Sequence, residues 1–149
     1  MARRIELDRT PDGLRLLVWR PIDAPAEEVW DVFVDTALWP EWGPSVTAVE
    51  STDRRVVEGT TGRVRTVAGR WLPFTVTAQT GSRWTWQIGP VPATGHRVEP
   101  TKTGSQAAFE IPLYAAPYAV VCWWALRSID RLATDSAVAM ARGQPADTD

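Results

Sequence analysis

The sequence predicts an α+β helix-and-sheet fold, in which a curved antiparallel sheet of seven strands packs against a long C-terminal helix, with two short N-terminal helices between its first and second strands. Two observations lead to this prediction. Strand-like runs are joined by short, glycine-containing connections, which are typical of β-hairpins and therefore of antiparallel pairing. The last long segment, residues 117–142, has helical periodicity and stops at Gly143. About 25 helical residues span roughly 38 Å, enough to cross a whole curved sheet.

The N-terminal part predicts one strand and two short helices. Apolar residues alternate over residues 14–20, and Pro21 closes this first strand. Asp23 is the expected N-cap of the first helix, and Pro25 lies near its start, where a missing N–H costs little. A second short helix is expected over residues 36–42, broken at Pro40.

Six further strands are expected after these helices, each bounded by turn signals. They cover residues 46–53, 62–68, 71–79, 83–88, 95–101 and 105–113. Residues 89–94 are expected to form a proline-rich loop.

The long helix has one apolar stripe and one mainly polar face. The stripe predicted to face the sheet consists of Val121, Trp124, Ala125, Ser128, Ile129 and Leu132. Trp123 is expected on the polar face, beside Arg127 and Asp130. An indole in that place indicates a contact with a loop or with a second copy in a homodimer.

A local signature resembles a known family. Residues 22–30 read Ile-Asp-Ala-Pro-Ala-Glu-Glu-Val-Trp, Asp35 follows, and residues 39–44 read Trp-Pro-Glu-Trp-Gly-Pro. This resembles the polyketide cyclase/dehydrase and lipid-transport branch of the START-like (SRPBCC) helix-grip superfamily, over residues 14–142. The resemblance implies a sheet that grips the last helix, with a ligand cavity between them. It implies no catalytic residue, because these vary within the superfamily, and Trp30, Trp39 and Trp42 are expected to seat the short helices.

Strand alternation predicts which side chains face that cavity. The expected ligand-binding residues are Phe74, Trp84, Trp86, His96, Phe109, Tyr114, Tyr118, Val121 and Trp124. Large aromatic side chains suit a flat apolar ligand, and they suit an ordinary filled core equally well.

His96 is the only histidine and has the parity of an inward residue. It is either a general acid or base in a cavity, or a buried neutral histidine bonded to a carbonyl or a tyrosine. Arg63, Arg65, Glu99 and Glu110 are expected to face solvent or pair across strands, and a buried Arg–Glu pair in the cavity is the alternative.

Composition removes several classes of function. The net charge is −2 and the arginine pairs are isolated, so no nucleic-acid partner is expected. One histidine and one cysteine leave too few ligands for a zinc site, and no glycine-rich phosphate loop occurs, so no metal or cofactor is expected. Cys122 lies in an apolar helix and is expected to be inert.

The same features favour a single domain over residues 1–142, with a flexible tail over 143–149. No signal peptide is recognised, and the most apolar segment, 115–126, is too short to span a bilayer. A cytoplasmic location is therefore expected.

Three hypotheses for function remain open. The first is a non-catalytic binding or carrier domain for a hydrophobic small molecule, a lipid or a polyketide-like compound. The second is a polyketide aromatase/cyclase or dehydratase that uses His96 as general acid or base. The third is an interaction module or dimer that binds no ligand.

Overall fold

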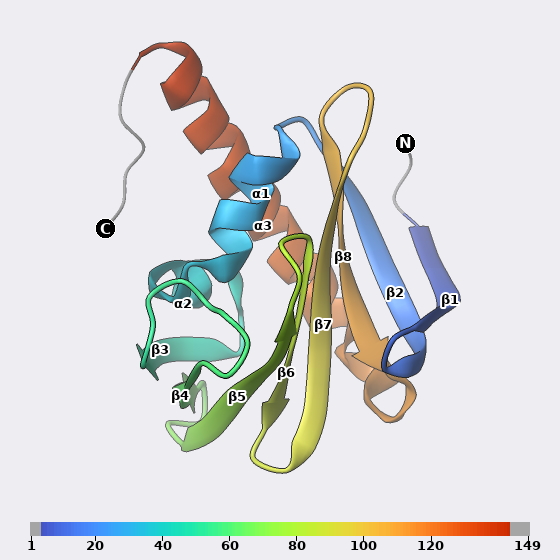
Figure 1. Cartoon of the computed structure of the whole chain (residues 1–149), viewed down its shortest axis with the longest axis vertical. Coiled ribbons are helices and arrows are strands. Elements are labelled where there is room, and N and C mark those ends of the chain that lie inside the picture. Colours follow the sequence, from blue (N-terminus) through green and yellow to red (C-terminus); the bar gives the residue numbers. More distant parts are fainter. Residues whose placement is uncertain (1–3, 144–149) are drawn as a thin grey trace.

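The computed structural model describes residues 4–143 and contains one eight-stranded antiparallel sheet gripping a long helix (Figure 1). The strands lie in the order β1-β2-β8-β7-β6-β5-β4-β3. Their bounds are β1 Arg4–Thr10, β2 Gly13–Ile22, β3 Val46–Ser51, β4 Thr61–Thr66, β5 Trp71–Gln79, β6 Arg83–Ile88, β7 Val91–Pro100 and β8 Ser105–Pro112.

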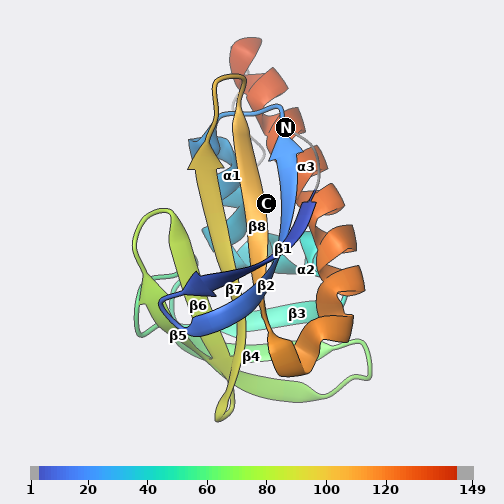
Figure 2. The same ribbon diagram turned by 90° about the vertical axis from the view of Figure 1, so that its right-hand side faces the viewer.

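The helices lie between β2 and β3 and after β8. They are α1 Ala26–Val34, the 3₁₀ turn η1 Thr36–Leu38, α2 Trp39–Trp42, the 3₁₀ segment η2 Leu113–Tyr118 and α3 Ala119–Ala141. Helix α3 runs beside the sheet over most of the length of the molecule (Figure 2). Arg20 on β2 reaches Asp130 on α3 at 2.7 Å, which identifies the face of the sheet that α3 covers. We call this the inner face and the opposite one the outer face.

The predicted fold class is confirmed, and the strand count is wrong by one. The additional strand, β1, pairs with β2 at the edge of the sheet. Its apolar residues Ile5 and Leu7 alternate with charged ones, but both are more than half exposed. Edge strands bury little apolar surface, and here only two apolar residues take part in the alternation, so the strand signal is short.

Three boundaries differ from the expectation. Pro25, not Asp23, precedes α1, and it makes no side-chain capping bond. Pro40 lies in the first turn of α2 and does not break it, because proline is tolerated there. The expected loop at 89–94 is mostly strand: β7 begins at Val91, and its proline at 92 lies beside a register shift.

The C-terminal helix begins two residues after Pro117, which lies inside η2. Gly143, with a φ of +74°, follows its last turn. Of the expected tail at 143–149, residues 144–149 lie outside the described residues. Within residues 4–143, no helix combines the length and apolarity that crossing a membrane requires.

The stripe of α3 that packs on the sheet differs from the predicted one. The buried side chains of α3 are Cys122, Ala125, Leu126, Ile129 and Ala133. Trp123 is partly buried against the core, whereas Trp124 is 54% exposed with its ring under the Arg127 guanidinium. The two adjacent tryptophans have the same hydropathy, so the sequence could not indicate which of them faces the sheet. Small side chains at 122, 125 and 133 let the helix approach the sheet closely, which a tryptophan would prevent.

The outer face holds a buried ionic cluster that the sequence did not place there. Glu110 is fully buried, and its carboxylate accepts hydrogen bonds from Arg83 at 2.7 Å and from Arg97 at 3.0 Å. Asp12, in the β1–β2 turn, pairs with Arg83 at 2.7 Å. A Cβ atom at Gly95 would lie 2.8 Å from the Glu110 carboxylate, so any larger residue at this strand position would displace the carboxylate from its arginine partners. The Arg–Glu pair is therefore buried, but across the sheet from α3.

Candidate functional site

A cavity of about 320 Å³ lies between the inner face of the sheet, the η2–α3 segment and the chain that joins α2 to β3. Its size is near the lower limit of ligand pockets, which run from roughly 300 to 1,000 Å³. Its lining is mostly apolar and includes seven aromatic side chains, those of Trp39, Trp42, Trp84, Trp86, Phe109, Tyr114 and Tyr118. The helix-grip arrangement therefore leaves a hollow that the side chains do not fill.

The structure brings together seven of the nine residues proposed from the sequence. Those lining the cavity are Trp84, Trp86, His96, Phe109, Tyr114, Tyr118 and Val121. Phe74 lies behind the wall, buried, with its ring 5.4 Å from that of Trp39 and 5.7 Å from that of Trp86. Trp124 does not line the cavity, because the face of α3 that carries it is turned to solvent.

His96 is buried in the wall and is hydrogen-bonded through both ring nitrogens. Its Nδ1 lies 3.2 Å from the carbonyl oxygen of Trp84, and its Nε2 lies 3.0 Å from Oγ1 of Thr94. A carbonyl only accepts, so Nδ1 carries a proton, and because burial lowers the pKa of the ring to about 3, Nε2 is unprotonated and accepts from the Thr94 hydroxyl. The Thr94 oxygen in turn accepts from Nε1 of Trp86 at 3.2 Å. The network therefore selects the Nδ1–H tautomer of the neutral ring.

Burial also keeps this imidazole neutral. Desolvation lowers the pKa of His96 from 6.5 to about 3, the bond to the Trp84 carbonyl opposes this, and the positive charge of Arg83 adds to the lowering. The ring stacks on Trp84 with 3.8 Å between ring centroids. A base with a pKa near 3 and no free lone pair is poorly suited to proton transfer near neutral pH.

Trp84 is held between two other rings. The ring of Trp39, in α2, lies parallel to that of Trp84 with 5.3 Å between the ring centroids. The imidazole of His96, in β7, also stacks on Trp84. Its indole N–H is the one buried side-chain nitrogen or oxygen in residues 4–143 that has no hydrogen-bond partner. An unpaired buried donor costs on the order of 1–3 kcal/mol. The aromatic wall thus retains one donor that no protein acceptor uses.

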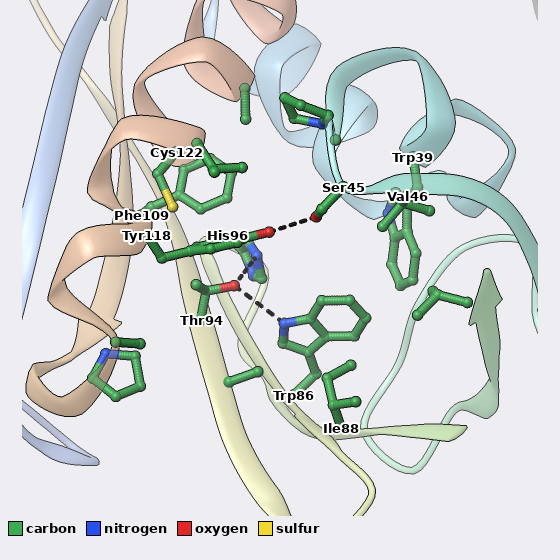
Figure 3. Close-up of a pocket in the computed structure, with 18 of the residues that line it drawn as sticks. Trp39, Ser45, Val46, Trp86, Ile88, Thr94, His96, Phe109, Tyr118 and Cys122 are labelled. Atoms are coloured by element: carbon green, nitrogen blue, oxygen red, sulfur yellow. Dashed lines mark hydrogen bonds between the residues drawn. The ribbon is translucent and has the colours of Figure 1, made fainter. Parts of the chain in front are cut away.

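Two hydroxyl groups meet at the mouth of the cavity. Oγ of Ser45, in the segment between α2 and β3, lies 2.6 Å from Oη of Tyr118 in η2. Tyr118, Ser45 and Trp86 reach toward the same space from three different segments (Figure 3). Burial raises the pKa of Tyr118, and the bond to Ser45 opposes this rise. Tyr114 donates its hydroxyl to the carbonyl of Pro92 near the same opening.

Three contributors to this site were not among the expected ligand-binding residues. Trp39 and Trp42 seat α2 as expected, because their indole N–H groups donate to the carbonyls of Phe33 and Val32 at 3.0 and 3.1 Å. Their rings also line the cavity. Ser45 directly follows Pro44, the last residue of the signature segment 39–44, so its position next to that signature was the available signal.

The cavity wall contains no acid, lysine or arginine among the described residues that line it. Charged residues make up 23% of the chain, so a lining of this size without any of them differs clearly from the average composition of the chain. Cys122 lines the cavity as well, and burial raises the pKa of its thiol to about 12. Within the described ranges, no group of three or more His, Cys, Asp or Glu side chains is placed to hold a metal ion.

Comparisons with known proteins agree with this architecture. The profile of a family described as polyketide cyclase / dehydrase and lipid transport matches residues 15–137. A solved structure from Mesorhizobium loti aligns with a TM-score of 0.62 at 15% identity, over 80% of this chain and 95% of that one. One from Rhodobacter sphaeroides gives 0.61 at 19% identity, over 89% and 99%.

A third solved structure, that of Ara h 8.0201, aligns with a TM-score of 0.59 at 13% identity, over 80% of this chain and 96% of that one. At such identities these likenesses show the fold alone. No curated protein matches the chain.

Proposed function

This chain belongs to the polyketide cyclase/dehydrase and lipid transport family, and we propose that it binds or carries a hydrophobic small molecule, a lipid or a polyketide-like compound, without catalysis. The observation that carries the proposal is the unfilled, uncharged and mostly apolar cavity between sheet and helix, with seven aromatic side chains in its wall. Burial of apolar ligand surface supplies affinity at about 25 cal/mol per Å² removed from water.

The condition of His96 supports binding over catalysis by this residue. A cyclase or dehydratase mechanism needs a group that gains and loses a proton near neutral pH. His96 donates from one nitrogen, accepts at the other and has a pKa lowered to about 3. Its role under this proposal is to order Trp84, Trp86 and Thr94 in the wall.

A neutral fluorescent probe tests the proposal directly. We expect N-phenyl-1-naphthylamine to bind the purified protein with one site and to show the enhanced emission typical of an apolar environment. Val121→Trp places a large ring in the cavity and should abolish binding. Val138→Trp is the matched control, because Val138 is exposed on the same helix and does not line the cavity.

Two outcomes would contradict the proposal. One is a wild-type protein that binds neither the probe nor any member of a panel of lipids and aromatic polyketides. The other is equal probe binding by wild type and Val121→Trp, which would place the probe elsewhere. Circular dichroism of both variants checks that each is folded.

A further inference from the structure

The wall of the cavity has no charge to offer a ligand. Its polar groups are the hydroxyls of Ser45, Thr66, Thr94, Tyr114 and Tyr118, the imidazole of His96 and the indole N–H groups. His96 is neutral in its hydrogen-bond network and adds no cation. An ionised ligand group inside this wall would lose its hydration without gaining a counter-ion, which is strongly unfavourable.

Charged residues on the outer face of the sheet do not make the burial of an ionised ligand group more favourable. Arg83 is the outer-face cation whose field reaches His96, and it is already paired with Glu110 and Asp12. Arg15 bonds the carbonyl of Ala93 at 2.8 Å, and its side chain lies on the outer face by strand parity with Leu17. Neither guanidinium lines the cavity.

Volume and shape restrict the ligand further. A space of about 320 Å³ corresponds to roughly ten water molecules at ~30 Å³ each. The ring of Trp39 comes from α2 and those of Trp86 and Phe109 from the sheet, and aromatic rings prefer offset-stacked or edge-to-face contacts with other rings. Flat walls and small volume fit one or two fused rings better than a long flexible chain.

The hydroxyl pair at the mouth supplies one directional contact. Ser45 and Tyr118 share a single proton between their oxygens, so the second hydroxyl proton of the pair is free to be donated. Thr94 has used its proton on His96 and one lone pair on Trp86. The one hydroxyl proton that remains available at the opening can therefore be donated to one neutral, oxygen-bearing group of a ligand.

We infer that the ligand is an uncharged, compact aromatic molecule of one or two rings, with a hydroxyl or carbonyl group held at the Ser45–Tyr118 mouth. This inference rests on the proposed binding function and narrows its ligand class. It excludes free fatty acids and other anionic amphiphiles from the cavity.

Four probes of similar size separate charge from shape. Calorimetric titration at pH 7 compares 2-naphthol with 2-naphthoate, and 1-decanol with decanoate. We expect 2-naphthol to bind most tightly, 2-naphthoate at least about thirtyfold more weakly, and 1-decanol more weakly than 2-naphthol.

Equal affinities for 2-naphthol and 2-naphthoate would overturn the inferred selection against charged ligands. Tighter binding of 1-decanol overturns the preference for rings. Either result leaves the proposed function standing, whereas no binding by any probe, N-phenyl-1-naphthylamine included, overturns both.

A cation added at the rim provides a gain-of-function test. Val91 lines the cavity and is half exposed, so Val91→Lys can place its ammonium at the opening without disturbing the core. We expect affinity for 2-naphthoate to rise about three- to fivefold, the range of a partly exposed ion pair, and that for 2-naphthol to stay unchanged.

Val138→Lys is the control, because position 138 lies thirteen residues along α3 from Ala125 of the wall, about 20 Å away and beyond the Debye length. Unchanged binding of 2-naphthoate by Val91→Lys, or an equal gain in Val138→Lys, overturns the inference that missing charge causes the selection.

Discussion

At the scale of single residues, His96 illustrates how the fold decides the chemistry of a side chain. Its imidazole is buried, stacks on Trp84 and is bonded at both nitrogens. A histidine with those partners orders the wall of a cavity, although the same residue type at a cavity surface is a common acid or base.

The lowered pKa of His96 predicts a specific pH dependence of stability. The unfolded chain takes up a proton near pH 6.5, and the folded protein only near pH 3. The unfolded state is therefore favoured as the pH falls from about 6.5 toward 3, by about 1.4 kcal/mol per pH unit, and this contribution is absent above that window.

Urea unfolding at pH 7, 6, 5 and 4 checks this for wild type and for His96→Asn, whose amide can still donate to the Trp84 carbonyl. We expect the wild-type free energy of unfolding to fall more steeply than that of the variant below pH 6.5. Parallel profiles would show that folding does not lower the pKa of His96.

At the scale of elements, the cavity depends on segments that are far apart in the sequence. The hydrogen bond of Ser45 to Tyr118 joins the α2–β3 segment to η2, across the mouth. Ser136 on α3 donates to Glu28 on α1 at 2.9 Å, and Arg20 holds the middle of α3 to β2. The helices are thus tied to each other and to the sheet around the hollow.

Removing the bond at the mouth should speed ligand release. We expect Tyr118→Phe to raise the dissociation rate of N-phenyl-1-naphthylamine about two- to tenfold, the effect of one hydrogen bond, as measured by stopped-flow fluorescence. Tyr114→Phe is the matched control, since its hydroxyl bonds the Pro92 carbonyl and does not reach the α2–β3 segment. An equal acceleration in both variants would show that the Ser45–Tyr118 contact has no special part in closure.

At the scale of the whole molecule, the sheet has two differently built faces. The inner face supplies the aromatic wall, while the outer face carries the ionic cluster of Glu110, Arg83, Arg97 and Asp12. The four residues come from β8, β6, β7 and the β1–β2 turn, so the cluster ties strands together on the side away from α3. Buried ion pairs of this kind are costly to break, because one partner is left charged and unpaired.

Glu110→Gln should therefore lower the free energy of unfolding by about 3–5 kcal/mol in urea denaturation. Glu50→Gln is the control: it breaks the exposed pair with Arg63 and should have little effect. Since the cluster lies across the sheet from the cavity, we expect folded Glu110→Gln to bind N-phenyl-1-naphthylamine with unchanged affinity. Equal stability losses in the two variants would contradict the role given to the outer-face cluster.

Strand alternation was sufficient to predict most of the wall. Trp84, Trp86 and Phe109 line the cavity and Phe74 lies buried behind it, because side chains of a paired strand alternate between two faces whatever surrounds them. The weaker signals failed. Strand β1 has only two alternating apolar residues, both exposed, and was missed, while on α3 the stripe was assigned to Trp124, which is exposed, and not to Cys122 and Leu126, which are buried.

The sequence by itself determined the helix-grip fold, through local periodicity, turn residues and the signature in residues 22–44, and family and structural comparisons confirm it. Only the tertiary structure decided which face of α3 meets the sheet, that Glu110 is buried on the outer face, and that His96 is neutral. These properties depend on distances between segments remote in the chain, and on the water that packing excludes, neither of which a local pattern contains.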